Sequence, residues 1–347
     1  MHTPLRIALL AMLNAPAACT AAVQPLSPEA QSARVGPMSS GISFPVTVRR
    51  DSRISWISPD AKTAGALLFE SDPASGDVDI FSLPDLAHKG RLTGFSAPLG
   101  ECSDSRGDVW VVNFGLHELD EFSHGGAPLG KITSPTYYLW SCAVSPRDGT
   151  IAITILNRPH SRPGEVLLYS SPSAKPRILR NPEQAYDFFA AFDPSGTLWV
   201  DGSDVLGHFI LSKCGGKKCA TMNLTGGSIF SAGAVVWDDV AGGLVIFDTT
   251  CRDIGLACSY PVTTAGDVGP PSFYETHGDA APCALRQAAL MRSGSTIRVV
   301  GADNEAACGS SKQSTADLWA YPNGNRPLKY HKEGAASPFG AAVSVKR

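Results

Sequence analysis

Short runs of alternating apolar and polar residues, each followed by a turn, succeed one another along most of the chain. The clearest begins at Cys102 and passes through Asp104 and Gly107 into the alternating segment 109–112. A period of two gives a strand one buried side, and Asp, Pro and Gly supply the backbone angles of a tight hairpin turn. We therefore expect two antiparallel strands over residues 102–112.

The same pattern occurs six times, and its turn glycines are regularly spaced. They are Gly65, Gly107, Gly149, Gly196, Gly242 and Gly294, separated by 42, 42, 47, 46 and 52 residues. Most units also contain a later strand segment, at 77–82, 118–123, 165–170 and 208–212. A period of this length indicates one supersecondary unit repeated along the chain.

About four strands per repeat of roughly 40 to 45 residues is the size of a propeller blade. The sequence therefore predicts an all-β fold, a six-bladed β-propeller with four-stranded blades, over residues 51–347. Residues 337–345 resemble the first strand of a unit with nothing after it, and such a strand can close the ring by pairing with the first blade. An open solenoid would leave this strand unpaired, so we favour the propeller over a solenoid or a sandwich.

These units resemble the blades of the NHL and SMP-30/gluconolactonase-like six-bladed propellers. The segment 319–324, followed by Pro338-Phe339-Gly340, resembles the end of uncharacterised exported bacterial members of that group. The resemblance covers most of residues 50–347. It implies the architecture, whereas proteins of one fold differ widely in activity.

The first residues predict export. Arg6 precedes an apolar stretch at 7–13 that is too short to span a bilayer, and residues 1–19 have the pattern of a signal peptide. Residues 20–50 are rich in Pro, Ser, Ala and Gln, which predicts a flexible linker. The mature protein should therefore lie outside the cytoplasm, secreted, periplasmic or tethered to a membrane by lipid.

Cys19 has two interpretations. Small residues before a Cys at the end of an apolar run resemble a bacterial lipobox, which would make Cys19 a lipidation site. Pro16 stands where that box usually has Leu. The alternative is ordinary signal-peptide cleavage after Ala17 or Ala18.

Eight cysteines remain after Cys19, and an even number in an exported chain predicts disulfide bonds. Nearness in sequence favours three pairs, which are Cys214 with Cys219, Cys251 with Cys258 and Cys283 with Cys308. Two glycines in the segment 214–219 favour a bridge there over a zinc site, because no second ligand cluster lies nearby. The remaining two, Cys102 and Cys142, occupy matching places in successive repeats, where they are either bridged or small buried apolar residues.

Charge excludes several classes of partner. Charged residues make up 18% of the chain, the net charge is -3, and Lys and Arg form no run, so the sequence predicts no binding to nucleic acid or anionic membranes. No segment after residue 19 is long and apolar enough for a transmembrane helix. We expect a monomer.

No catalytic or cofactor signature is recognisable. The resemblance to gluconolactonases implies a divalent metal held by a Glu, two Asn and an Asp. The inner segments offer Glu101, Asp187, Asp193 and Asp238, but they have no Asn at the corresponding places, and the family's early Glu-Gly-Pro motif is missing. Since Asp193 and Asp238 also suit plain turn roles, we predict no metal and keep a metal-dependent hydrolase of the lactonase class as the alternative.

A ligand at the mouth of the propeller channel would meet the residues where inner strands begin. Our candidates are Glu101, Trp140, Asp187, Phe188 and Trp237. The favoured function is a non-catalytic extracytoplasmic binding or scaffold propeller for an unknown protein or small-molecule ligand.

Other aromatic residues favour structural roles. Three tryptophans alternate with aliphatic residues inside strands, which predicts core packing, and three histidines without metal-ligand spacing predict surface positions. The tryptophans are Trp110, Trp199 and Trp319, and the histidines are His117, His124 and His208.

Overall fold

The computed structural model describes residues 54–134, 136–156, 163–249, 251, 257–275, 285–304, 314–332 and 335–346. The chain divides into two units, residues 1–36 and 37–347, and all described residues belong to the second. The predicted signal peptide, the linker and Cys19 lie outside the described residues. No helix among the described residues is long and apolar enough to cross a membrane.

The strands of the described residues form five sheets. The first has the order β1-β4-β3-β2-β25 and consists of Trp56–Ile57, Ala87–Thr93, Asp77–Ser82, Ala66–Asp72 and Gly340–Val345. The second is β5 to β8, consisting of Pro98–Ser103, Val109–Asn113, Glu118–Phe122 and Pro128–Thr133. The third is β9 to β12, consisting of Leu139–Val144, Ile151–Ile155, Glu165–Tyr169 and Arg177–Leu179. The fourth is β13 to β16, consisting of Tyr186–Phe192, Leu198–Ser203, Phe209–Gly215 and Lys218–Thr221.

The fifth sheet has eight strands in two antiparallel ladders. The first ladder is β17 to β20, consisting of Val235–Asp238, Gly243–Asp248, Ala257–Val262 and Ser272–Tyr274. The second is β21 to β24, consisting of Ala288–Ser293, Thr296–Asp303, Thr315–Ala320 and Gly324–Lys332. One parallel pairing, between Tyr274 and Asn325, joins the ladders at their outer strands. The described residues also include two short 3-10 helices, η3 (Pro59–Thr63) and η4 (Phe114–Leu116).

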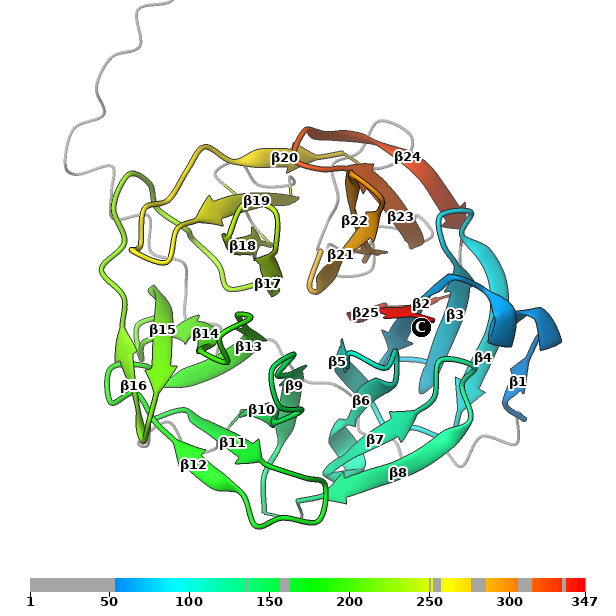
Figure 1. Ribbon diagram of the computed structural model, residues 1–347, viewed down its shortest axis with the longest axis horizontal. Helices are drawn as coiled ribbons and strands as arrows, with labels where there is room; N and C mark the ends of the chain where they lie inside the picture. Colours follow the sequence, from blue (N-terminus) through cyan, green and yellow to red (C-terminus); the bar gives the residue numbers. More distant parts are fainter. Residues whose placement is uncertain are drawn as a thin grey trace, which may run out of the picture. The chain divides into compact units, whose positions relative to one another are not determined.

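One strand of each four-strand group lies nearest a common centre, with the others following outward (Figure 1). These inner strands are β5, β9, β13, β17, β21 and β25. Contacts run from β25 to β5, β9, β13, β17 and β21 in turn, and β21 contacts β25 again. The all-β prediction is confirmed, and the sheets are arranged around an axis, as the repeats predict.

Antiparallel pairing fixes two faces of this arrangement. The turns from inner strand to second strand, and from third to fourth, lie on one face, which we call the hairpin face. The connections from second to third strand, and from fourth strand to the next inner strand, lie on the other, which we call the loop face. Five of the six predicted turn glycines, from Gly107 to Gly294, have positive φ on the hairpin face, as such turns require.

The first repeat differs from the prediction. Trp56 and Ile57 pair with β4 at the outer edge of the first sheet, not with β2, and Gly65 is not among the glycines with positive φ. The inner strand of this sheet is instead β25, which pairs with β2 from Ala66↔Val345 to Ser71↔Gly340. The pattern at 57–69 imitates a hairpin because a 3-10 helix carries the same Pro-Asp signal.

His124 also differs from the prediction, because it is buried. Its Nδ1 lies 2.7 Å from the hydroxyl of Ser344 in β25, and its Nε2 lies 2.9 Å from the carbonyl oxygen of Ala64. The Ser344 hydroxyl also donates to the carbonyl of Gly107. His124 therefore links the second sheet to the C-terminal strand.

Apolar side chains fill the spaces between neighbouring sheets. Trp110, Trp199 and Trp319 are at most 2% exposed, which confirms their predicted core role. The largest apolar cluster runs from the second sheet through the third and fourth to the β17 to β20 ladder. Each sheet therefore buries its faces against its neighbours, which a single sheet cannot do alone.

Candidate functional site

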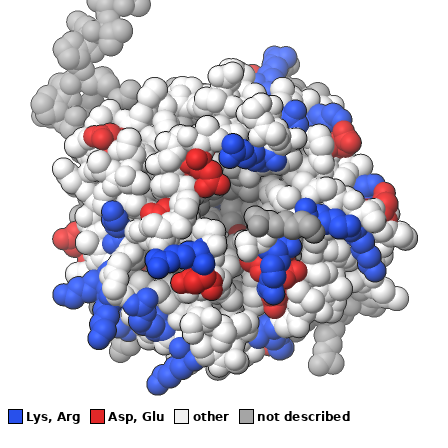
Figure 2. Space-filling view, in the orientation of Figure 1, with Lys and Arg blue, Asp and Glu red and all other residues white. Residues whose placement is uncertain are grey.

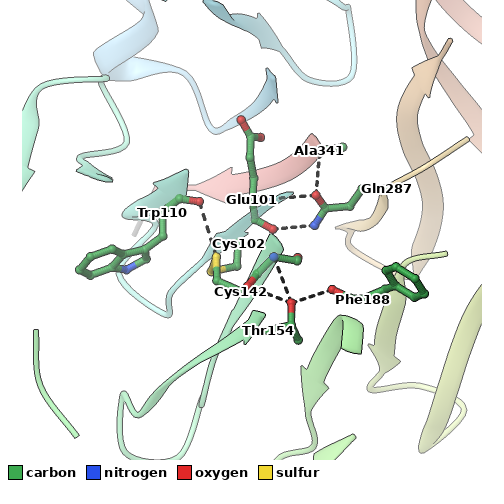
Figure 3. The surroundings of a disulfide bond; sticks show 9 residues. Glu101, Cys102, Trp110, Cys142, Thr154, Phe188, Gln287 and Ala341 are labelled. Atoms are coloured by element: carbon green, nitrogen blue, oxygen red, sulfur yellow. Dashed lines mark hydrogen bonds between the residues drawn. A yellow bond between two sulfur atoms is a disulfide. The ribbon is translucent and has the colours of Figure 1, made fainter. Parts of the chain in front are cut away.

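Gln287 pairs with the backbone edges of two inner strands. It immediately precedes β21, and its carboxamide donates to the carbonyl oxygen of Glu101 at 2.6 Å and accepts from the amide of Glu101 at 2.9 Å (Figure 3). The Ala341 amide of β25 donates to the same Gln287 oxygen at 3.3 Å. One carboxamide thus makes hydrogen bonds with backbone groups at the edges of β5 and β25, as a neighbouring strand would.

The Glu101 carboxyl group is enclosed between β5 and β25. It points away from the nearby disulfide in Figure 3, and a Cβ on Gly340 would lie 3.0 Å from its Cγ. Its oxygens have no hydrogen-bond partner of normal geometry among the described residues. Burial raises the pKa of Glu101 well above its usual range, and the Ala342 amide offsets this only in part.

Cys102 and Cys142 form a disulfide between the second and third sheets, with Cα atoms 5.6 Å apart. Of the two interpretations of these residues, the bridged one is confirmed. Near this bond, the Thr154 hydroxyl donates to the Phe188 carbonyl at 2.7 Å and accepts from the Ser141 amide (Figure 3). A covalent bond and a polar side chain therefore join β5, β9 and β13 around the axis.

The other predicted cysteine pairs divide by location. Cys214–Cys219 and Cys251–Cys258 are disulfides, which confirms both predictions. Cys283 and Cys308 lie outside the described residues, and their pairing stays a prediction.

Asp187 lies on the loop face within a buried polar network. Its carboxyl accepts from Gln184 Nε2 at 2.6 Å, and the same nitrogen donates to the Asp201 carbonyl at 3.0 Å. The Ser212 hydroxyl donates to Gln184 Oε1. A Cβ on Gly164 would lie 2.7 Å from the Asp187 carboxyl, so only glycine leaves room for it.

Three carboxyl groups influence one another in this network. Burial raises the pKa of Asp187 to about 8, with Gln184 lowering it and the nearby Glu165 raising it. Burial also raises the pKa of Asp201, whose carboxyl accepts from the Phe189 amide at 2.7 Å, and the charge of Asp187 adds to this rise. The uncharged form of Asp187 is therefore favoured up to mildly alkaline pH.

Two of the candidate residues meet in an aromatic cluster. The rings of Trp140 and Phe188 lie 5.6 Å apart edge to face, and Phe339 packs on Trp140 at 5.2 Å. Tyr186 stacks on Phe188 at 6.2 Å. Trp140, Phe188 and Phe339 are at most 6% exposed, so they pack against one another and leave no open stacking platform.

The remaining candidates do not join this cluster. Trp237 stands one residue before the Asp238 turn and so at the hairpin end of its strand, whereas Trp140 and Phe188 stand at the loop end of theirs. Its indole Nε1 is buried without a hydrogen-bond partner among the described residues. Glu101 lies in the space between β5 and β25. The five candidates therefore form one pair and three separate positions.

The inner carboxylates do not fit a shared metal. Among the residues that the structure describes, no three His, Cys, Asp or Glu side chains are placed to hold an ion together. Asp193 and Asp238 accept backbone N–H bonds inside their own turns, as predicted for turn residues. Gln184 and Gln287 were not candidates, because a lone Gln carries no spacing signal in sequence.

An apolar patch lies on the loop face of the second sheet and the entry to the third. Tyr138 lies 5.2 Å from Phe114 and 4.7 Å from His117, ring centre to ring centre. His117 Nδ1 lies 2.7 Å from the Tyr137 carbonyl oxygen, which fixes the ring. Leu116 is 42% exposed and Tyr138 40%. We call Phe114, Leu116, His117 and Tyr138 the Leu116 patch.

Comparison with known proteins shows likenesses of fold. No family model and no curated protein matches the chain. A chain in the crystal structure of a nidogen/laminin complex is 11% identical, with a TM-score of 0.60, covering 82% of this chain and 100% of that one. A protein of unknown function from Bacteroides caccae is 9% identical, with a TM-score of 0.58, covering 81% and 99%.

A streptogramin B lyase is 13% identical, with a TM-score of 0.50, covering 79% of this chain and 82% of that one. At such identities the similarity carries information on fold and none on activity. The chain has the fold of the β-propeller proteins.

Proposed function

We propose that the chain is a six-bladed propeller of the NHL and SMP-30-like kind that binds a protein partner outside the cytoplasm and performs no catalysis. Support for six blades comes from the six inner strands, each in contact with the next. The single bridge inside the eight-stranded sheet favours counting its two ladders separately. Support for a closed ring comes from β25, which pairs with β2 and contacts both β5 and β21.

The observation that carries the binding role is the Leu116 patch. Tyr138 and Leu116 are exposed, and Tyr138 packs on Phe114 and His117. Exposed apolar side chains grouped in this way are typical of interaction surfaces. Val205 and Leu206, 66% and 67% exposed, add apolar side chains to the same face at the turn after β14. A chain of similar fold occurs in a nidogen/laminin complex, so the fold is compatible with such a role.

The polar groups near the axis favour binding over catalysis. Gln287 is occupied by strand edges, Gln184 by Asp187 and Asp201, and the Asp201 carboxyl by the Phe189 amide. These groups support the fold, and among the residues that the structure describes they leave no convergent set of the kind that catalysis needs.

Site-specific photo-crosslinking tests this proposal. A benzophenone amino acid at Leu116 or Tyr138 should give a defined higher-mass adduct with an extracytoplasmic protein in the producing cell. The same probe at Leu129, which is 52% exposed on the outer strand β8, is the matched control and should give none. Equal adducts at all three positions, or none at Leu116 and Tyr138, would contradict the proposal.

Metal analysis of the purified chain distinguishes the non-catalytic proposal from the alternative of a metal-dependent hydrolase. The purified chain should contain no stoichiometric calcium or zinc. If it does, and if Asp187→Ala or Asp193→Ala removes that metal, the non-catalytic proposal is wrong. A lyase shares the fold, so this measurement is needed beside the crosslinking.

The extracytoplasmic location rests on the three disulfides, which persist in oxidising compartments. Mass spectrometry of the membrane fraction distinguishes the two forms of the N-terminus. A diacylated Cys19 would mean a lipid tether, and an unmodified chain beginning near Ala18 would mean free secretion.

A further inference from the structure

A second surface feature lies on the hairpin face, between the third and fourth sheets. A cavity of about 120 Å³ opens there. Its lining is mixed: Leu168, Leu179, Phe192 and Leu198 come from both sheets, and polar side chains surround them. The polar side chains are Ser145, Asp148, Thr150 and Arg177. An apolar cavity of about 150 Å³ holds a benzene molecule, so this one suits a single aliphatic side chain.

Two arginines flank the cavity, and neither forms an ion pair within 4.0 Å with a described residue, although the charge of Arg147 acts on the Asp148 carboxylate. Arg177 lines it and donates to the carbonyl of Gly216. Arg147 donates to the Ser195 carbonyl at 2.9 Å, and its Cδ would lie 3.2 Å from a Cβ on Gly196, another lining residue. Both side chains thus keep their positive charge beside the opening while backbone oxygens hold them in place.

More cations stand on the neighbouring strands and turns. They are Lys175, Lys217 and Lys218, all exposed and none in an ion pair with a described residue. Lys213 is not one of them, because its ammonium group lies over the Trp199 ring on the other face of the fourth sheet. Figure 2 shows Lys and Arg side chains gathered along the lower left of this view, the region that β12, β15 and β16 occupy in Figure 1. Asp148 is the acidic residue of the lining, and it accepts from the Thr150 amide within its own turn.

The folded chain therefore concentrates positive charge that its sequence disperses. The cations come from the turn after β9, from β12 and from the β15 to β16 hairpin, which span 72 positions from 147 to 218. Because the net charge is -3 and the sequence has no basic run, this basic surface cannot be predicted from the sequence. A ligand that fits it needs negative charge at the rim and one apolar group in the middle.

We propose that this cavity and the arginines beside it bind an acidic peptide segment of a partner protein, with one apolar side chain in the cavity and flanking carboxylates on Arg147 and Arg177. An acidic peptide fits better than a sulfated or phosphorylated sugar, because Leu and Phe side chains form part of the lining. The site is on the opposite face from the Leu116 patch, so it goes beyond the function proposed above and can stand if that proposal fails.

Selection from a random dodecamer peptide library displayed on phage tests this site with the full chain. Enriched peptides should carry Leu, Met or Ile flanked by Asp or Glu. Their affinity should fall about tenfold or more on Arg147→Glu with Arg177→Glu, and should weaken as salt rises. The charge-matched control is Lys329→Glu with Lys332→Glu on β24, which should leave affinity unchanged.

A second variant separates the cavity from the charge. Thr150→Trp fills the opening without altering the cations and should reduce affinity about as much as the arginine reversals. Circular dichroism shows whether each variant folds. If Thr150→Trp does not fold, the Arg147→Glu and Arg177→Glu reversals at the surface still test the proposal. Enrichment of basic or neutral peptides, no enrichment, or affinity indifferent to the arginine reversals would overturn the proposal.

Discussion

Asp187 and Asp193 stand at opposite ends of the same inner strand, β13, and are 3% and 8% exposed, yet their pKa values shift in opposite directions. Burial acts to raise both. At Asp193, hydrogen bonds from Ser195 and Thr197 outweigh it and lower the pKa. At Asp187, the single hydrogen bond from Gln184 does not outweigh burial, and the pKa of the carboxyl group rises to about 8.

The difference lies in where each carboxyl group finds its donors. Asp193 takes backbone N–H bonds from within four residues, so the turn is complete in itself. Asp187 depends on a Gln side chain and on the space that Gly164 of another sheet leaves for it. At β13, the hairpin end is therefore fixed by local sequence, and the loop end by a contact between sheets.

The largest effect that this comparison predicts comes from Gln184→Met. It removes the Gln184 donor of the Asp187 carboxyl and the Asp201 carbonyl and the acceptor of the Ser212 hydroxyl, which keeps only its bond from Asn181. It should lower the free energy of unfolding by about 3–5 kcal/mol. The hairpin-end counterpart is Ser195→Ala, which removes one side-chain bond to Asp193 and should cost less than about 1 kcal/mol.

Urea unfolding of both variants measures the two costs. A loss below about 1 kcal/mol for Gln184→Met would mean that the loop-end network is not cooperative, and the contrast between the two ends would then fail.

The pH dependence of stability distinguishes the two aspartates by sign. Since the folded pKa of Asp187 is about 8 and an unfolded Asp titrates near ~3.9, its contribution is fully present below about pH 4 and is lost as pH rises toward 8. The expected slope is up to about 1.4 kcal/mol per pH unit. Asp187→Asn should flatten this fall between pH 5 and 8, leaving the part due to Glu101 and Asp201.

Asp193→Asn is the matched control with the opposite sign. The folded pKa of Asp193 is lowered, so its contribution is present above the unfolded pKa and is lost on acidification. Urea unfolding curves at pH 3 to 8 measure the pH dependence of stability for the Asp187→Asn and Asp193→Asn variants. Parallel pH profiles for wild type and Asp187→Asn would contradict the assignment of Asp187.

The same contrast explains what sequence could predict. The turns of the hairpin face follow from Asp, Pro and Gly at fixed places, and five of the six turn glycines have the expected positive φ. Short-range cysteine pairs follow from spacing. Gln287 and Glu101 are 186 positions apart, and no local pattern marks either as the other's partner. Gly65 failed as a turn glycine because a 3-10 helix shares the signal of a hairpin.

Of the ligand candidates, Trp140 and Phe188 follow from their position at the start of inner strands, and they contact each other, while their role in binding a ligand stays a prediction. The exposed Leu116 patch was missed, because its rings come from two connections between strands, whose packing depends on the sheets beneath. Sequence therefore gives the positions of the repeating elements, while the surfaces between repeats need the folded chain.

The smallest predicted effect belongs to the hairpin face. Gly149 has φ of 73°, and a Cβ there would have nothing within 4 Å, so Gly149→Ala incurs only the cost of a left-handed backbone, about 1 kcal/mol. Gly215 also has open space around it but no positive φ, and Gly215→Ala should change stability by less than about 0.5 kcal/mol. Because the turn is local, the cost of Gly149→Ala should add to that of Gln184→Met in the double variant, measured by urea unfolding. A clear departure from additivity would mean that the two faces communicate through the third and fourth sheets, and the hairpin face would then depend on more than its own turn residues.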